Sequence, residues 1–392
     1  MDHFDVILVG GGLANMLIAI RLATTRRDLR ILIAEAKGRI GGDHTWSYHS
    51  KDVTPCQDLW LSSIGNATWP SQLVQFPSYK RTLATGYRTL TSDDLRRRLA
   101  NYSVEIILST RVNNITNNSI TLDGGQKIFG TCVIDGRGIQ SFTNLKLGYQ
   151  KFFGIEFEMF EPHYLSEPII MDSVVDQTDG YRFIYSLPYS PTSILIEDTY
   201  YSPNSSLNRD RIANSLYYYA QSKGWKIKAV KREETGVLPV VIDGKFESIW
   251  PSNESTPRSG IRAGFFHNTT GYSLPFSAAA AQNLASIEVL NSSNASVYLR
   301  AEAQKFWNKQ HYFQLLNRML FVAARNDEHR GIFQRFYRLP RPLIERFYAA
   351  ELNIWDKFQI LYGKPPVSIC RAMSVVLSCR TSNKKKINLS VK

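Results

Sequence analysis

The spacing of apolar positions changes period twice within the first 35 residues. Residues 4–9 form a short run rich in β-branched residues, residues 10–12 are three glycines, and residues 13–23 place apolar side chains at helical spacing. Residues 29–35 form a second apolar run, which ends in an acid. This order predicts a strand, a helix and a second strand, which is typical of a dinucleotide-binding unit.

The next hundred residues predict short elements joined by turns. Residues 40–49 are glycine-rich and then polar-aromatic, so we expect a loop. Residues 92–100 predict a helix with Ser92 as its N-cap and acids in its first turn. Strands are predicted within 104–115 and 118–130, with a hairpin at 123–125, and a buried strand is predicted to end at Asp135.

The pattern of the second half favours a mixed or antiparallel sheet followed by helices. Alternating apolar runs predict strands at 152–160, 181–190, 192–202 and 234–242, with one helix over 208–223. Residues 258–290 are interpreted as a strand, a glycine-rich loop and an alanine-rich helix. Residues 300–360 are interpreted as helical, and the end of the chain from Thr381 as a flexible tail.

The glycine turn carries the first candidate chemistry. A pyrophosphate needs backbone N–H donors and the positive end of a helix, which here opens at Leu13. Gly10 allows the tight turn, and Gly12 leaves room for phosphates. Asn15 stands where the GxGxxG pattern has its third glycine, and Glu35 is placed to accept hydrogen bonds from ribose hydroxyls.

A second glycine cluster, residues 260–271, favours FAD over NAD. Large flavoproteins return to the cofactor late in the chain, where a strand delivers a glycine and a helix N-terminus faces the flavin; Gly264 and Gly271 fit that order. Phe265 replaces the acid common after that glycine. His267 is interpreted either as a flavin neighbour or as an ordinary loop histidine.

These elements predict an α/β (α+β) fold: a Rossmann-type FAD-binding domain of the glutathione-reductase-like class with an inserted mixed β-sheet substrate domain and C-terminal helices. We expect the FAD-binding domain at 1–149 and 236–299 and the substrate-binding sheet at 150–235. A basic-aromatic helical region follows at 300–370, and 371–392 is expected to be flexible.

The net charge of +13 favours binding to an anionic partner, which would be nucleic acid or a membrane surface. Residues 300–350 hold ten Lys/Arg against four acids, interleaved with aromatic residues, which suits a bilayer interface. The alternative is a solvated helix face with an aromatic core behind it. We expect peripheral membrane association and no nucleic-acid binding.

Several features predict a cytoplasmic protein. The N-terminus has no basic region followed by an apolar stretch and a cleavage site, and no run of about 18 apolar residues occurs. The four cysteines form no CxxC pair and are expected to be reduced. No metal is expected, because His44 and His49 have no third ligand nearby.

A set of longer motifs is similar to one known family. The segments VGGGLANMLIAIRL, GGDHTWSYH, LIEDTYY, EETGVLPV and IRAGFFHNTTGYSLP resemble, in order, motifs of the bacterial lycopene β-cyclases. The resemblance runs from residue 4 to about 367; Asn15 agrees with the family, and Met16 departs from its usual Gly.

The resemblance implies a non-redox flavoenzyme. Its substrates would be lycopene and other acyclic carotenoids, whose ψ ends become β rings, giving β-carotene via γ-carotene. Reduced FAD would be required, with NAD(P)H serving only to reduce it. The enzyme would lie on the cytoplasmic face of the inner membrane.

The family's essential acid lies in a segment that corresponds here to residues 195–199. Protonation of an alkene needs a neutral acid in a dry site, which a buried carboxyl with a raised pKa provides. The resemblance therefore implies Glu197 as the general acid, with Glu197 or Asp198 removing the final proton. Trp46, Tyr48 and Tyr272 are candidates for stabilising the cation. A strand-end pair facing solvent is the alternative for Glu197 and Asp198, and a substrate role for Glu233–Glu234 stays open.

Two other functions remain open from the residues. An FAD-dependent hydroxylase or prenyl-chain reductase would share the N-terminal unit and the late glycine loop. A non-enzymatic basic protein that binds a membrane surface or nucleic acid would explain the charge. Consumption of NADPH in proportion to product would favour the first, and absence of bound flavin the second.

Overall fold

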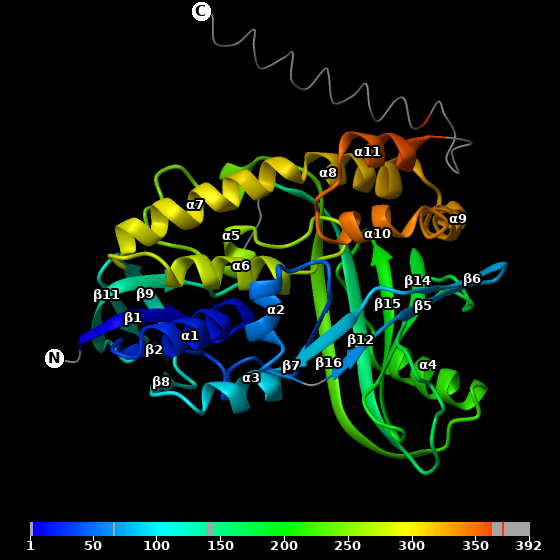
Figure 1. The fold of residues 1–392 in the computed structure, drawn as a ribbon, viewed down its shortest axis with the longest axis horizontal. Helices are drawn as coiled ribbons and strands as arrows, with labels where there is room; N and C mark the ends of the chain where they lie inside the picture. Colours follow the sequence, from blue (N-terminus) through cyan, green and yellow to red (C-terminus); the bar gives the residue numbers. More distant parts are fainter. Residues whose placement is uncertain (1–2, 66, 139–143, 363–370, 372–392) are drawn as a thin grey trace, which may run out of the picture.

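The computed structural model describes residues 3–65, 67–138, 144–362 and 371. Two large sheets stand side by side, with helices packed on one face of the first, on one face of the second and at one shared end (Figure 1). A three-stranded sheet accompanies them; its strands are β3 (Thr45–His49), β7 (Tyr87–Thr91) and β4 (Ala67–Trp69).

The first large sheet has six strands and contains the N-terminal unit. From edge to edge they are β8 (Val104–Ile107), β2 (Ile31–Ala34), β1 (His3–Val9), β11 (Lys127–Asp135), β10 (Ser119–Leu122) and β9 (Val112–Thr116). The first four run parallel, and β10 and β9 are antiparallel. Side chains alternate between the two faces of β1. Val6 and Leu8 pack in the core between the sheet and the helices, while Ile7 and Val9 pack on the opposite face.

Helices on this sheet bring distant parts of the chain together. They are α1 (Leu13–Thr25), α2 (Pro55–Leu61), α3 (Ser92–Leu99), α5 (Gly260–Ala263), α6 (Leu274–Ala285) and α7 (Ser292–Lys309), with the 3-10 turn η1 (Phe246–Ser248). α1 packs along α6 (Figure 1). The predicted strand–helix–strand unit is confirmed, and the late helix returns to it.

The second large sheet has seven strands. In order they are β16 (Ile227–Asp243), β12 (Lys146–Met159), β15 (Ser193–Ser202), β14 (Tyr181–Pro188), β13 (Ile169–Asp172), β5 (Gln72–Phe76) and β6 (Tyr79–Leu83). Only β13 and β5 pair in parallel. β5 and β6 precede the predicted substrate segment 150–235 by many residues, so this sheet draws strands from both sides of that boundary.

The two faces of the seven-stranded sheet have different covers. α4 (Arg209–Ser222) packs on one face, with Ile212 and Leu216 against Ile194 and Ile196 of β15. Helices from the C-terminal part cover one end of the other face (Figure 1). They are α8 (His311–Arg318), the π-helical segment η2 (Met319–Ala323), α9 (Asn326–Phe336), α10 (Arg341–Tyr348) and α11 (Ile354–Leu361).

Three local predictions were wrong. Residues 45–49 form strand β3 on β7, not a loop. The N-cap of α3 is Thr91, whose hydroxyl accepts from the Asp94 amide at 3.2 Å; Ser92 instead donates to the Gly41 carbonyl. Residues 260–263 form a helical turn, not a strand. The predicted tail, 371–392, lies outside the described residues except for Arg371, which pairs with Glu328.

Candidate active site

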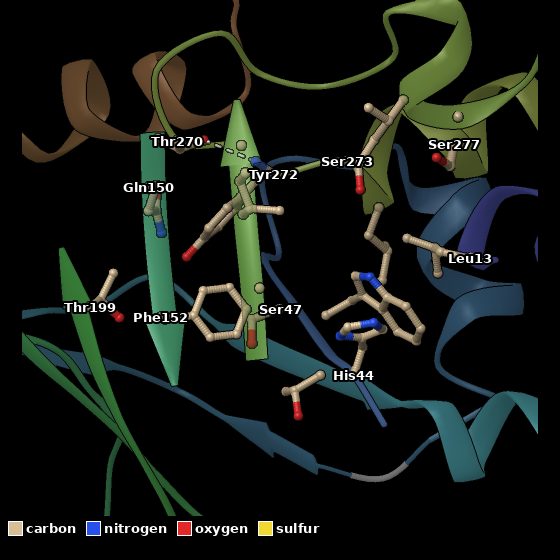
Figure 2. A pocket seen from close by; sticks show the side chains of 18 of the residues that line it. Leu13, His44, Ser47, Gln150, Phe152, Thr199, Thr270, Tyr272, Ser273 and Ser277 are labelled. Atoms are coloured by element: carbon tan, nitrogen blue, oxygen red, sulfur yellow. Dashed lines mark hydrogen bonds between the residues drawn. The ribbon is translucent and has the colours of Figure 1, made fainter. Parts of the chain in front are cut away.

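A cavity of about 310 Å³ lies between the two large sheets. Its walls include the start of α1, residues 44–47, β12, β15 and the late loop 270–274 (Figure 2), together with residues of β13, β14 and β16. Leu13 of α1 and Thr199 of β15 lie on opposite sides of the space, with Phe152 and Tyr272 between them (Figure 2). The size is within the range of small-molecule sites.

The glycine loop at the start of α1 has the properties of a phosphate site. Gly10 has φ +92°, and a Cβ there would lie 2.9 Å from the Gly136 carbonyl oxygen. Gly12, the N-cap, faces open space, and no side chain caps the helix or places an acid in its first turn. The amides of that turn therefore remain available to an anion, so the cradle fits a pyrophosphate.

Asn15 ties the early glycine loop to the late one. Its amide nitrogen donates to the carbonyls of Val9 and Gly10 at 3.0 and 2.8 Å, and its oxygen accepts from the Ser259 hydroxyl at 2.6 Å. Asn15 also lines the cavity. At the third glycine position of the GxGxxG motif, the Asn15 side chain thus forms hydrogen bonds between the two loops that a glycine could not form.

Glu35 lies beside the glycine loop and outside the cavity lining. Its carboxylate accepts from the amides of Gly11 and Lys37, at 2.6 and 2.8 Å. This places an acid at the end of β2, next to the phosphate cradle. The ribose contact expected for Glu35 stays a prediction.

The two late glycines differ in position. Gly271, with φ +71°, lines the cavity, and a Cβ there would lie 2.8 Å from Leu238. Gly264, with φ +86°, ends α5 near Ile249 and is not among the lining residues. His267 is fully buried; its Nε2 lies 2.9 Å from the Phe347 carbonyl, and burial lowers its pKa to about 4. It organises the loop and does not line the cavity.

Glu197 faces the cavity and has a second carboxyl beside it. Gly154 in β12 pairs with Glu197 of β15 on one side and with Glu234 of β16 on the other. A Cβ on Gly154 would lie 2.6 Å from Glu197 Cγ and 3.3 Å from Glu234 Cγ. The missing side chain therefore lets two buried carboxyls meet across the central strand.

The two carboxyls have unequal surroundings. Glu234 pairs with the Arg232 guanidinium and accepts from the Thr45 hydroxyl at 2.7 Å. Glu197 has no cation of its own. Burial raises the pKa of Glu197 well above its usual range, and the charge of Glu234 and a hydrogen bond to it raise that pKa further, against the opposing effect of Arg232. The arrangement therefore favours the protonated form of Glu197, while the guanidinium pairs with Glu234.

Asp198, the neighbour of Glu197, lies on the other face of β15, outside the cavity. Arg182 donates to both of its oxygens, at 2.8 and 3.1 Å, and the Tyr200 hydroxyl donates at 3.0 Å. Successive side chains of a strand point to opposite faces. Asp198 is thus an ion-paired carboxylate under α4, and its predicted part in proton removal has no geometric support.

Several aromatic side chains also line the cavity. Trp46 and Tyr272 line the cavity, whereas Tyr48 is buried in the core of the first sheet. Tyr87 joins two hydroxyls, those of Tyr185 and Tyr272, at 2.9 and 3.0 Å. Electron-rich rings and a neutral carboxyl thus share one space, an arrangement that can protonate a weak base and stabilise a cation.

Sequence reasoning left Glu234 undecided and did not single out Gly154. Glu234 lies 37 positions after Glu197, and only the register of three strands brings them together. A glycine within a strongly alternating strand was the one available signal, because such a residue marks close approach of neighbours.

The described residues form neither a metal site nor a membrane-spanning helix. In that part of the chain no three His, Cys, Asp or Glu side chains gather as a metal site. None of its helices has both the length and the apolar character required to span a bilayer.

Comparisons with known proteins agree along the whole chain. A family model described as "Lycopene cyclase protein" matches residues 5–374. The lycopene beta-cyclase of Pseudescherichia vulneris is 43% identical over 95% of this chain and 97% of that protein. The Pantoea ananas enzyme of the same name is 42% identical over 96% and 98%.

Solved structures share the fold at low identity. A flavin-dependent brominase matches with a TM-score of 0.61 and 13% identity, over 89% of this chain and 94% of that one. A geranylgeranyl bacteriochlorophyll reductase-like protein of Thermoplasma acidophilum gives 0.56 and 14%, over 93% and 97%. The predicted Rossmann-type flavoprotein fold is confirmed.

Proposed function

The chain belongs to the lycopene cyclase family, and on that premise we propose that it closes the ψ ends of lycopene into β rings by acid catalysis, giving β-carotene via γ-carotene. One observation carries the assignment of the site: a buried, proton-holding Glu197 faces an aromatic cavity whose far wall is the phosphate cradle of α1.

Glu197 acts as the general acid. It donates its proton to C2 of the ψ end, which places a cation at C1; the C5=C6 bond then attacks C1, and the charge moves to C5. Loss of the C6 proton forms the ring double bond. One proton enters and one leaves, so no electrons are transferred overall. The Glu197 carboxylate left by the first step lies in the same cavity and takes the final proton.

FAD is the proposed cofactor. Gly10, Gly12, Leu13 and Asn15 would hold its pyrophosphate at the start of α1, with Glu35 toward the ribose and Gly271 in the opposite wall. Reduced FAD supplies negative charge that stabilises a nearby cation. NAD(P)H is the proposed reductant. Gly264, the other predicted cofactor residue, ends α5 and is not among the residues that line the cavity.

The main rival is an oxidoreductase, since the brominase and the reductase-like protein share this fold. A fold alone does not decide the reaction. The family match and the carboxyl pair favour the cyclase. NAD(P)H consumed in proportion to product would contradict it.

The decisive experiment is expression of Glu197→Gln in a lycopene-producing bacterial host, with pigments separated by chromatography. We expect β-carotene formation to fall by at least about 100-fold, because general acid catalysis is lost, while purified protein keeps its flavin absorbance. Glu233→Gln is the matched control: Glu233 is half-exposed and pairs with Arg209. Full cyclisation by Glu197→Gln would remove Glu197 from its role.

We also propose peripheral association with the cytoplasmic face of the inner membrane. The proposed substrate is an apolar polyene that dissolves in lipid. The basic-aromatic segment 300–350 supports a lipid surface as the anionic partner.

A further inference from the structure

A second cavity, of about 150 Å³, adjoins the first. The two share four lining residues: Met171, Tyr201, Thr270 and Tyr348. The same side chains border both spaces, so the two cavities lie next to each other with these four residues between them. The inner cavity reaches Glu197, and the outer cavity lies among η2, α9, α10 and α11.

The outer cavity is lined mainly by apolar side chains. They include Leu316, Leu320, Phe333, Phe336, Ile360 and Leu361. Of the described helices around it, α11 also presents several large apolar side chains outward. A lining of this kind accepts a hydrocarbon chain and offers few hydrogen bonds to a polar ligand.

Helix α11 differs from an ordinary surface helix, because it presents large apolar side chains to the outside and a charged side chain to the protein. Asp356 is buried and accepts from the Arg346 guanidinium at 2.7 and 2.6 Å, so this acid faces the protein, as does Ile360, which lines the outer cavity. Ile354 and Trp355 are 83% and 74% exposed, and Phe358 is 55% exposed. Their spacing of one and four residues places them on one outward stripe.

Such a stripe on a helix beside an apolar cavity marks an interaction site. Its chemistry suits a bilayer interface, where Trp and Phe enter the acyl boundary and cations meet anionic headgroups. Cations border it: Lys357 lies on α11 itself, and the Arg335 guanidinium of α9 donates to the carbonyl of Tyr362, just beyond the helix.

We propose that α11 docks on an anionic bilayer surface and that the second cavity is the route by which a long apolar polyene passes from the lipid to Glu197. The substrate class rests on the proposed function; the docking surface does not. A polyene taken up this way never crosses water, and only its reacting end needs to reach the inner cavity.

The docking surface is tested with FAD-loaded, full-length protein and vesicles of phosphatidylglycerol and phosphatidylcholine. The double variant Trp355→Glu, Phe358→Glu is expected to bind vesicles at least about tenfold more weakly in co-sedimentation. Val289→Glu is the control, since Val289 is 62% exposed in the turn between α6 and α7. Unchanged binding of the double variant, or no vesicle binding by the unaltered protein, would overturn the proposal.

The route is tested by placing the same bulky side chain at two positions of α11. Ile360→Trp is expected to fill the outer cavity and lower kcat/KM for vesicle-borne lycopene at least about tenfold, with vesicle binding and flavin content unchanged. Gln359→Trp, at an exposed position of α11 next to Ile360 and off the docking stripe, is expected to leave turnover unaltered. Equal turnover by the two variants would overturn the route.

Assays in detergent and in vesicles distinguish a failure of the docking proposal from a failure of the proposed function. If the unaltered protein cyclises lycopene in detergent but the glutamate double variant fails only with vesicles, docking is supported. If the unaltered protein cyclises lycopene in neither medium, the proposed function fails, and vesicle binding still tests the docking surface by itself.

Discussion

Glu197 and Asp198 are consecutive residues of β15, yet they project to opposite faces of the seven-stranded sheet and are neutralised in different ways. Under α4, Asp198 is fully buried against the Arg182 guanidinium. On the cavity face, Glu197 has another carboxyl as its neighbour and holds a proton in place of a cation.

The comparison separates two uses of a buried acid. An ion pair fixes a carboxylate in its charged state and contributes to structure, because either partner alone would be a buried charge. A carboxyl opposite a second carboxyl stays neutral and can give up its proton to a substrate. The position of one guanidinium thus decides which acid is structural and which is reactive.

The largest expected effect is on stability, from Asp198→Asn. The change leaves the largely buried Arg182 guanidinium, 12% exposed, without its anion, so the free energy of unfolding should fall by roughly 3–5 kcal/mol in urea denaturation. Adding Arg182→Gln should recover part of the loss, as a double-mutant cycle would show. A loss under about 1 kcal/mol would mean that the two faces do not differ as described.

The next effect comes from Gly154→Ala, which places a methyl group between Glu197 and Glu234. We expect a loss of about 1–3 kcal/mol in unfolding free energy from overpacking, together with slower cyclisation because the carboxyls are pushed apart. Gly124→Ala is the control, since a Cβ there meets nothing within 4 Å. Cyclisation at the full rate would show that the close pairing is not needed.

The smallest effect is a pH dependence. Because the pKa of Glu197 is raised in the folded protein, its contribution to stability is complete below the usual pKa of a carboxyl and is lost as pH rises through the folded pKa. Glutamine does not ionise. As pH rises, the unfolding free energy of Glu197→Gln should therefore increase relative to that of the unaltered protein. Parallel curves across the pH range would show that Glu197 is not the proton holder.

Local rules were sufficient for much of the fold. The strand–helix–strand start, the hairpin at residues 123–125 and α4 followed from periodicity and turn chemistry. The same rule of alternation separates Glu197 from Asp198 without a structure. It also suits β3, whose Trp46 and Tyr48 alternate with small polar residues, although the glycines before them favoured a loop.

The rest depended on contacts between distant segments. Glu234 becomes the neighbour of Glu197 only through the register of β16 and β15 on β12. Nothing near Glu234 in the sequence distinguishes it from Glu233, which faces Arg209 in solvent. The outward stripe of α11 is equally a tertiary property, because the side that faces the protein is set by the Arg346–Asp356 pair.

The hydrogen bond between Asn15 and Ser259 has a consequence for the order of biosynthesis. The ribosome makes the early phosphate cradle 244 residues before the hydroxyl that closes it. A nascent chain shorter than this has the glycine turn but lacks the late segment that Asn15 binds. This part of the candidate site is therefore completed only after synthesis is well past the middle of the chain.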